Sequence, residues 1–153
     1  MMRKYFYISS CLLFLLGCSN YKKSEFEKGI ELKYNSICNG SNSCTINIKE
    51  TTSFAWDKMF VFKTTSSLEI INEALGFTYP YFEDVAERVV FVKDNKVVYH
   101  DDYYPTFDDD VYTSLVFKLS NGLPYKSFST DSAIFKIEKK EIEKKQTYFV
   151  LSQ

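Results

Sequence analysis

The sequence contains a single histidine, His100, and none of the short motifs that mark a catalytic site. It has no Gly-x-Ser-x-Gly elbow, no glycine-rich phosphate loop and no His-Glu-x-x-His zinc motif. A Ser–His–Asp triad would have to use His100, and a structural zinc site takes four ligands, of which this is the only histidine available. We therefore predict no catalytic residue, no metal site and no cofactor, and we expect the protein not to be an enzyme.

A basic excess and a membrane-spanning run are also missing. The chain has 19 basic and 20 acidic residues, and Arg3 and Lys4 are the only charged residues before position 18. The remainder carries a net charge of about −3, whereas nucleic-acid-binding domains carry a basic excess. Residues 5–16 form the only long apolar run, and a spanning helix needs roughly 20 such residues. We therefore predict neither a nucleic-acid partner nor a membrane-spanning helix.

The apolar run nevertheless has the layout of an export signal. A positive start precedes residues 5–16, and a small residue, Gly17, then precedes Cys18. Residues 15–18, Leu-Leu-Gly-Cys, resemble the lipobox of bacterial lipoproteins. That resemblance implies that Cys18 receives a diacylglycerol and that a signal peptidase cuts after Gly17. An ordinary secretory signal cut elsewhere is the alternative.

The lipobox resemblance sets the expected location and domain boundaries. The membrane is a partner through the lipid anchor at Cys18, and the protein lies in the cell envelope. In a Gram-negative source it would lie on the outer membrane, facing the periplasm. We divide the chain into a signal peptide over residues 1–17, a lipidated cysteine and tether over 18–29, and a single domain over 30–153.

Two cysteines remain in the predicted domain, Cys38 and Cys44. The residues between them are dense in turn formers, so the two thiols are expected to lie close together. In an oxidising envelope compartment an even pair of this kind predicts a local disulfide. A metal-binding pair is the alternative.

Hydrophobic periodicity predicts an α+β fold. Residues 66–75 have helical spacing, with Ser66 as N-cap, Glu69 at the third helical position and Gly76 as terminator. Residues 83–87 could add another turn. β-rich runs predict an antiparallel sheet of about five to seven strands, with this one main helix packed on one face. The expected strands are residues 30–37, 45–49, 56–62, 89–93, 96–100, 113–119, 132–138 and 147–151. Asp94-Asn95 suits a two-residue hairpin turn between two of them.

A second resemblance is carried by residues 56–62, which read Trp-Asp-Lys-Met-Phe-Val-Phe. With the following Ser-capped helix, this stretch resembles a family of small uncharacterised lipoproteins and secreted proteins with a Trp-Asp-Lys-x-x-Val-Phe motif. The family implies no known activity. From the residues alone, Trp56, Phe60 and Phe62 are expected to pack beside the helix, and a Trp-lined ligand site is the alternative.

Residues 99–112 combine aspartates with large aromatic side chains. Aromatic side chains provide rigid contact area, while aspartates attract a basic partner. We predict a protein-binding surface here, made of Tyr103, Tyr104, Phe107, Asp108, Asp109 and Asp110. A solvated acidic loop without a binding role is the alternative. A calcium site or acid–base pair fits less well, because no Asp-x-Asp-x-Asp-Gly loop is present.

The function expected from these features is that of a non-enzymatic, envelope-tethered lipoprotein with a binding or structural role. One alternative is an immunity-type inhibitor that neutralises a toxin or an enzyme in the envelope. A third is a small envelope hydrolase that uses the carboxylates between His100 and Asp110.

Overall fold

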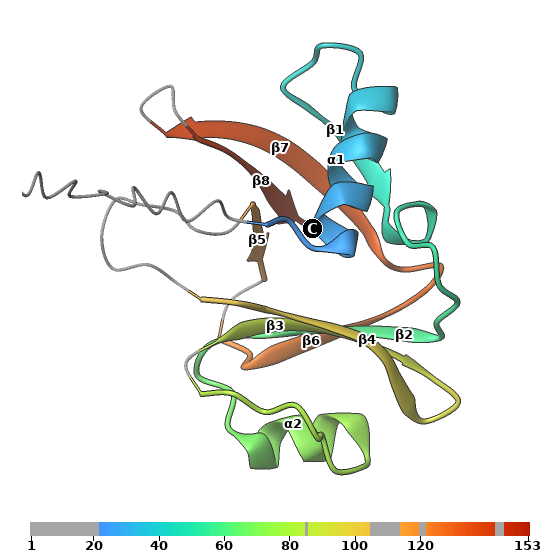
Figure 1. Ribbon diagram of the computed structural model, residues 1–153, viewed down its shortest axis with the longest axis vertical. Helices are drawn as coiled ribbons and strands as arrows, with labels where there is room; N and C mark the ends of the chain where they lie inside the picture. Colours follow the sequence, from blue (N-terminus) through green and yellow to red (C-terminus); the bar gives the residue numbers. More distant parts are fainter. Residues whose placement is uncertain (1–21, 85, 105–113, 120–121, 143–145) are drawn as a thin grey trace, which may run out of the picture.

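The computed structural model describes residues 22–84, 86–104, 114–119, 122–142 and 146–153. The described chain folds as two helices and eight strands in two sheets, which confirms the α+β class. The predicted single sheet is instead two sheets of four strands each. Figure 1 shows them as separate layers, with α2 on the far side of one of them.

The helices and strands follow this order along the chain: α1 (Glu25–Ile37), β1 (Ser43–Asn47), the 3-10 turn η1 (Ile48–Glu50), β2 (Lys58–Phe62), α2 (Leu68–Leu75), β3 (Glu87–Lys93), β4 (Lys96–Tyr103), β5 (Leu115–Lys118), β6 (Tyr125–Ser129), β7 (Ile134–Ile142) and β8 (Gln146–Ser152). The first sheet has the strand order β1-β7-β8-β5, and the second has the order β4-β3-β2-β6. Only the β5–β8 pair is parallel.

Helix α1 replaces the strand predicted over residues 30–37 and part of the predicted tether. Ser24 and Glu27 form a capping box, and Phe26, Ile30 and Tyr34 recur at helical spacing on the buried face. The helix contacts both sheets, since Phe26 packs on Phe91 of β3 and Tyr34 on Phe149 of β8. The folded domain therefore begins earlier than the predicted boundary at residue 30.

The second sheet is buried on both faces because alternate side chains of its strands pack into two separate hydrophobic clusters. Met59 and Val61 of β2 point into the main core between the sheets, and the intervening Phe60 and Phe62 point towards α2. The prediction that these two phenylalanines pack beside the helix is confirmed. Trp56 packs instead in the main core, 5.2 Å from the ring of Phe91.

The predicted helix over residues 66–75 is present as α2, with one correction at its start. Its N-cap is Ser67, whose hydroxyl accepts from the backbone N–H of Ile70, and not Ser66. The Ser66 hydroxyl is used elsewhere, as a donor to the carbonyl of Pro124 at 2.7 Å. Gly76 ends the helix with φ 77°, as predicted.

The predicted hairpin around Asp94-Asn95 is confirmed. Both residues have positive φ, 50° and 57°, as a two-residue primed turn requires. Asp57 holds this turn, because its carboxylate accepts from the backbone N–H of Asp94 at 3.0 Å. The register shifts once, between Phe91 and Val92 of β3. The remaining pairs then place Arg88 directly opposite Asp102.

Two further differences concern the second half of the chain. Strand β6 is not among the predicted strands. Strand β7 extends to Ile142, beyond the predicted end of this strand at residue 138. Of the residues 83–87 expected to add a helical turn, those described are not helical.

Candidate functional site

The outer face of the second sheet carries a buried ion pair. Arg88 is 1% exposed, and its Nη2 lies 3.3 Å from Oδ2 of Asp102 on the neighbouring strand. The same Nη2 donates to the backbone carbonyl of Glu83. Residues 76–84, which connect α2 to the segment before β3, therefore close over the guanidinium. This connection is tied to the sheet by the arginine itself.

Aromatic rings enclose the Arg88 guanidinium. Its Cζ lies 5.0 Å from the ring centroid of Phe82 and 5.5 Å from that of Tyr79. A cation over an aromatic face is stabilised by the ring quadrupole, most strongly when water is excluded. These rings offset part of the cost of removing the arginine from water, but they satisfy none of its N–H groups.

Within the described part of the chain, the buried side-chain N and O atoms that lack a hydrogen-bond partner all lie here. They are Tyr79 Oη, Arg88 Nε and Nη1, His100 Nδ1 and Asp102 Oδ1. We call these four residues the Arg88 cluster. Each unpaired buried polar atom costs about 1–3 kcal/mol, so such atoms are rare in native structures. Their concentration at one place indicates a site that takes up water or a polar ligand group.

A hollow of about 390 Å³ opens beside the Arg88 cluster. Its lining combines aromatic and acidic side chains: Pro80, Tyr81, Phe82, Glu83, His100, Asp101, Asp102 and Tyr104. Tyr81 and Tyr104 are 47% and 44% exposed, so both rings present surface to solvent. Tyr81 stacks on His100 with 4.2 Å between ring centroids, and the Tyr104 hydroxyl donates to the Glu83 carboxylate. No lysine or arginine belongs to this lining.

Burial shifts the pKa values of the titratable groups at this hollow. It raises the pKa of Asp102 to about 6, with the Arg88 charge opposing the shift and the charges of Glu83 and Asp101 adding to it. Burial also lowers the pKa of His100 below its ordinary value. The hydrogen bond to Glu83 raises the pKa of Tyr104 to about 12. At neutral pH the hollow therefore holds the ionised carboxylate of Asp102 and a neutral imidazole.

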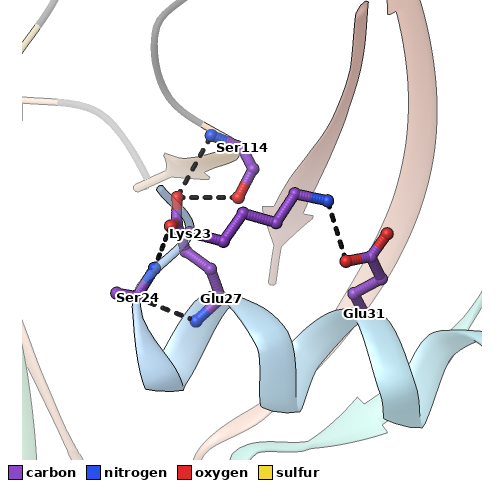
Figure 2. A network of polar contacts seen from close by, with 5 residues as sticks. All are labelled: Lys23, Ser24, Glu27, Glu31 and Ser114. Carbon is purple, nitrogen blue, oxygen red and sulfur yellow. Dashed lines mark hydrogen bonds and ion pairs between the residues drawn. The ribbon is translucent and has the colours of Figure 1, made fainter. Parts of the chain in front are cut away.

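A second polar network lies at the start of α1 (Figure 2), and α1 lies on the other side of the second sheet from α2 (Figure 1). Glu27 is 1% exposed, and its Oε1 accepts from the backbone N–H and the hydroxyl of Ser114 at 3.2 and 2.7 Å. Its Oε2 accepts from the backbone N–H of Ser24 at 2.8 Å. Lys23, which precedes the N-cap, pairs with Glu31 of the helix at 2.8 Å. Glu27 therefore fastens the start of β5 to the start of α1.

Tyrosine hydroxyl groups hold the carboxylate of Asp101 on the inner face of β4. The Asp101 carboxylate accepts from Tyr99 and Tyr103 at 3.3 and 3.1 Å. The Tyr99 hydroxyl in turn accepts from the backbone N–H of Phe26. Asp101 and Asp102 consequently point to opposite faces of β4, as alternation along a strand requires.

The predicted partner-binding residues are placed as follows. Tyr103 is 5% exposed and packs in the main core, so it offers no contact surface. Tyr104 lies at the rim of the hollow. Phe107, Asp108, Asp109 and Asp110 fall outside the described residues. Tyr81, Glu83 and Arg88 were not predicted as site residues.

The predicted Cys38–Cys44 disulfide is present, with 5.5 Å between the two Cα atoms. Cys38 is the C-cap of α1 and Cys44 belongs to β1, so the bridge joins two elements that follow each other. Cys18 lies outside the described residues.

A second hollow, of about 510 Å³, runs along α1. The helix approaches the segment after η1 closely at Gly29, where an added Cβ would lie 2.0 Å from the carbonyl oxygen of Thr51. Leu32 is 71% exposed beside this groove. Its lining is more apolar than that of the hollow at the Arg88 cluster, and it lacks buried unpaired polar atoms among the described residues.

Two searches of the described residues bear on other kinds of site. No described helix has the length and hydropathy needed to cross a bilayer. No described set of three or more His, Cys, Asp and Glu side chains is placed to hold a metal ion. Comparison of the chain with protein-family models, curated proteins and solved structures finds no match. Any functional argument therefore depends on the site itself.

Proposed function

We propose that this chain is a non-enzymatic binding protein of the cell envelope, tethered through a lipid on Cys18. Its binding surface is the hollow beside the Arg88 cluster, and its partner is a protein with a basic surface. The predicted surface residues Phe107, Asp108, Asp109 and Asp110 follow Tyr104 in the sequence. One observation carries the proposal: exposed Tyr81 and Tyr104 flank the carboxylates of Glu83 and Asp102 in a lining without lysine or arginine.

The chemistry of this lining suits protein recognition. Tyrosine supplies large, rigid contact area with few rotatable bonds, and it is enriched among the residues that dominate binding energy. Carboxylates at the rim accelerate encounter with a basic partner and select against acidic ones. Two residues of the Arg88 cluster, His100 and Asp102, also line the hollow that such a partner would enter.

The arrangement of Asp101 and Asp102 gives no support to the hydrolase alternative. A glycosidase-type mechanism needs two carboxyl groups facing one substrate. Asp101 turns inward to Tyr99 and Tyr103, whereas Asp102 turns outward and pairs with Arg88. The two neighbouring aspartates therefore do not form such a pair, and His100 contacts Tyr81 by ring stacking.

An immunity-type inhibitor is one form of the same function. Its partner would be a toxin or enzyme in the envelope, and a rigid surface that combines aromatic and acidic residues suits capture of a single basic protein. The lipid anchor on Cys18 would hold either kind of binder at the membrane, facing the periplasm in a Gram-negative source.

Site-directed photo-crosslinking in intact cells tests the proposal. A photoreactive phenylalanine analogue replaces Tyr81 in the full chain with its own leader, and the matched control carries it at Leu123, which is 56% exposed and does not line the hollow. We expect one discrete adduct of basic protein from position 81 and none from position 123. Glu83→Gln should reduce its yield. Equal labelling from both positions, or no adduct from position 81, would contradict the proposal.

A further inference from the structure

We infer that the hollow between Tyr81 and Tyr104 is a receptor for one organic cation, the alkylammonium or guanidinium group at the end of a lysine or arginine side chain. The inference rests on the proposed binding function and names the group of the partner that is recognised. The same chemistry occurs in free amines and guanidines, so both sources are compared below.

Asp102 has a buried carboxylate oxygen that lacks a hydrogen-bond donor. Asp102 uses Oδ2 for Arg88, while Oδ1 is buried and has no hydrogen-bond partner. A buried carboxylate oxygen is satisfied best by a charged N–H donor. Glu83 offers a further carboxylate at the rim, held in place by the hydroxyl of Tyr104. An ammonium or guanidinium group supplies several N–H donors at one point, which is the chemistry that both carboxylates accept.

The hollow is also lined by the aromatic rings of Tyr81 and Tyr104. Cations bind over the faces of tyrosine rings within about 6 Å of the ring centre, and aromatic side chains around a carboxylate are the usual receptor for organic cations. Tyr81 is held rigidly by its stack on His100. The same kind of cation–aromatic contact is present inside the protein, where the Arg88 guanidinium lies over the rings of Phe82 and Tyr79.

Arg88 also has free N–H groups, which would attract an anion if they faced the hollow. Arg88 is 1% exposed and does not line the hollow, since the rings of Tyr79 and Phe82 lie over its guanidinium. Its charge is already opposed by Asp102. An incoming ligand meets the carboxylates of Glu83 and Asp102, which repel an anion and attract a cation. It also meets the neutral imidazole of His100. Buried water is the natural partner for Nε and Nη1.

The test is an NMR titration of the detergent-extracted full chain, with the aromatic resonances of Tyr81 and His100 as readout. The probes are n-butylammonium, ethylguanidinium and, as the anionic counterpart, acetate. We expect both cations to shift these resonances saturably and acetate to leave them unchanged. A short lysine-containing peptide should bind about tenfold more tightly than n-butylammonium if the group arrives on a protein, and about equally if a free amine is the ligand.

Variants locate the binding. Glu83→Gln and Tyr81→Leu alter exposed side chains and should each weaken cation binding about five- to tenfold. Asp102→Asn removes the buried acceptor and should weaken it further, with the fold checked by the unchanged amide spectrum. Asp131→Asn, an exposed acidic residue in the turn after β6, is the matched control and should bind like the wild type.

The outcomes are distinguishable. Saturable binding of acetate but not of the cations would overturn the inference, and so would cation binding that is unaffected by Glu83→Gln and Tyr81→Leu. If the cations fail to bind while the Tyr81 cross-link persists, the inference is wrong and the proposed function stands. Cation binding without any cross-link would support the cation site and contradict the protein partner.

Discussion

At the scale of single residues, the buried carboxylate of Glu27 joins segments that are far apart in sequence. It accepts from Ser24 at the start of α1 and from both donors of Ser114 before β5. Replacing it with alanine leaves these donors without their acceptor, and hydrogen bonds to charged groups are worth about 1.5–3 kcal/mol each before relaxation. We expect Glu27→Ala to lower the free energy of unfolding by about 2–4 kcal/mol.

Urea denaturation measures this change. Glu31→Gln is the matched control, because Glu31 lies on the same helix and its contact among the described residues is a surface ion pair with Lys23. The control should stay within about 0.5 kcal/mol of the wild type. Similar stability of the two variants would show that the Glu27 network contributes little.

Asp102 gives a second prediction, on pH dependence. Its pKa is raised to about 6 in the folded protein, mainly by burial, so the folded state keeps a proton that the unfolded state releases. Stability from this group is therefore present at low pH and is lost as the pH rises from about 4 through 6. Asp101 and Glu87 also have raised pKa values and act in the same direction.

The comparison of Asp102→Asn with the wild type isolates this contribution. We expect the wild type to lose on the order of 1–2 kcal/mol more than the variant between pH 4 and pH 7, after allowing for partial solvent screening. Glu138, whose pKa is lowered to about 2 by Lys136 and Lys140, titrates below this range. Parallel stability profiles in urea unfolding would contradict the prediction.

The residues of the hollow could be predicted only in part from the sequence. The acidic aromatic composition after Tyr99 pointed to the right neighbourhood, and Tyr104 lies at the rim. The pairing of Arg88 with Asp102 depends on the register of the β3–β4 hairpin, which includes an irregularity at Phe91 and Val92 that no local pattern reveals. Tyr81 and Glu83 reach the site through the fold of the α2–β3 connection, which is a tertiary feature.

At the scale of elements, α1 was missed although its signals are present. Ser24 and Glu27 have the spacing of a capping box, and Phe26, Ile30 and Tyr34 the spacing of a helix face. The position soon after an export signal and the density of charged residues suggested a tether instead. Strand β7 was underestimated because its second half is exposed and polar, as an outward-facing strand can be. Local composition does not separate such a strand from a solvated connection.

The Cys38–Cys44 bridge gives a prediction at this scale. It restricts only the short loop between the end of α1 and β1, and loop closure of this size contributes roughly 2 kcal/mol in the chain-entropy model. We expect the Cys38→Ser, Cys44→Ser double variant to fold and to lose about that amount. Chemical denaturation measures the loss, and thiol trapping of the wild type establishes that the bridge is formed.

Reduced wild-type protein is the natural control for this variant. Its stability should match that of the double variant, because both lack the same covalent constraint. Two freely alkylated cysteines in freshly extracted protein, or failure of the reduced protein to fold, would contradict this account.

At the scale of the whole molecule, the proposed anchor places the domain close to a membrane. Five residues separate Cys18 from the N-cap Ser24, a reach of about 20 Å even when fully extended. Cys18→Ser should abolish metabolic labelling with a fatty acid and leave an unprocessed precursor, because no thiol remains to accept the lipid. Cys11→Ser, which lies inside the proposed signal, is the matched control and should be labelled normally.

Mass spectrometry of the mature amino terminus completes this test. A cleavage site away from the Gly17–Cys18 bond would remove the lipid anchor from the proposal. Label that persists in Cys18→Ser would do the same.

The strand order also constrains when the molecule can fold. In the sheet ordered β1-β7-β8-β5, the first strand of the chain pairs only with β7, and β5 pairs only with β8. Neither early strand has a neighbour until the end of the chain has emerged, whether from the ribosome or from an export channel. The contact of helix α1 with Phe149 forms equally late. The β2–β3–β4 meander with α2 can assemble first, and the chain stays open and threadable until its last residues arrive.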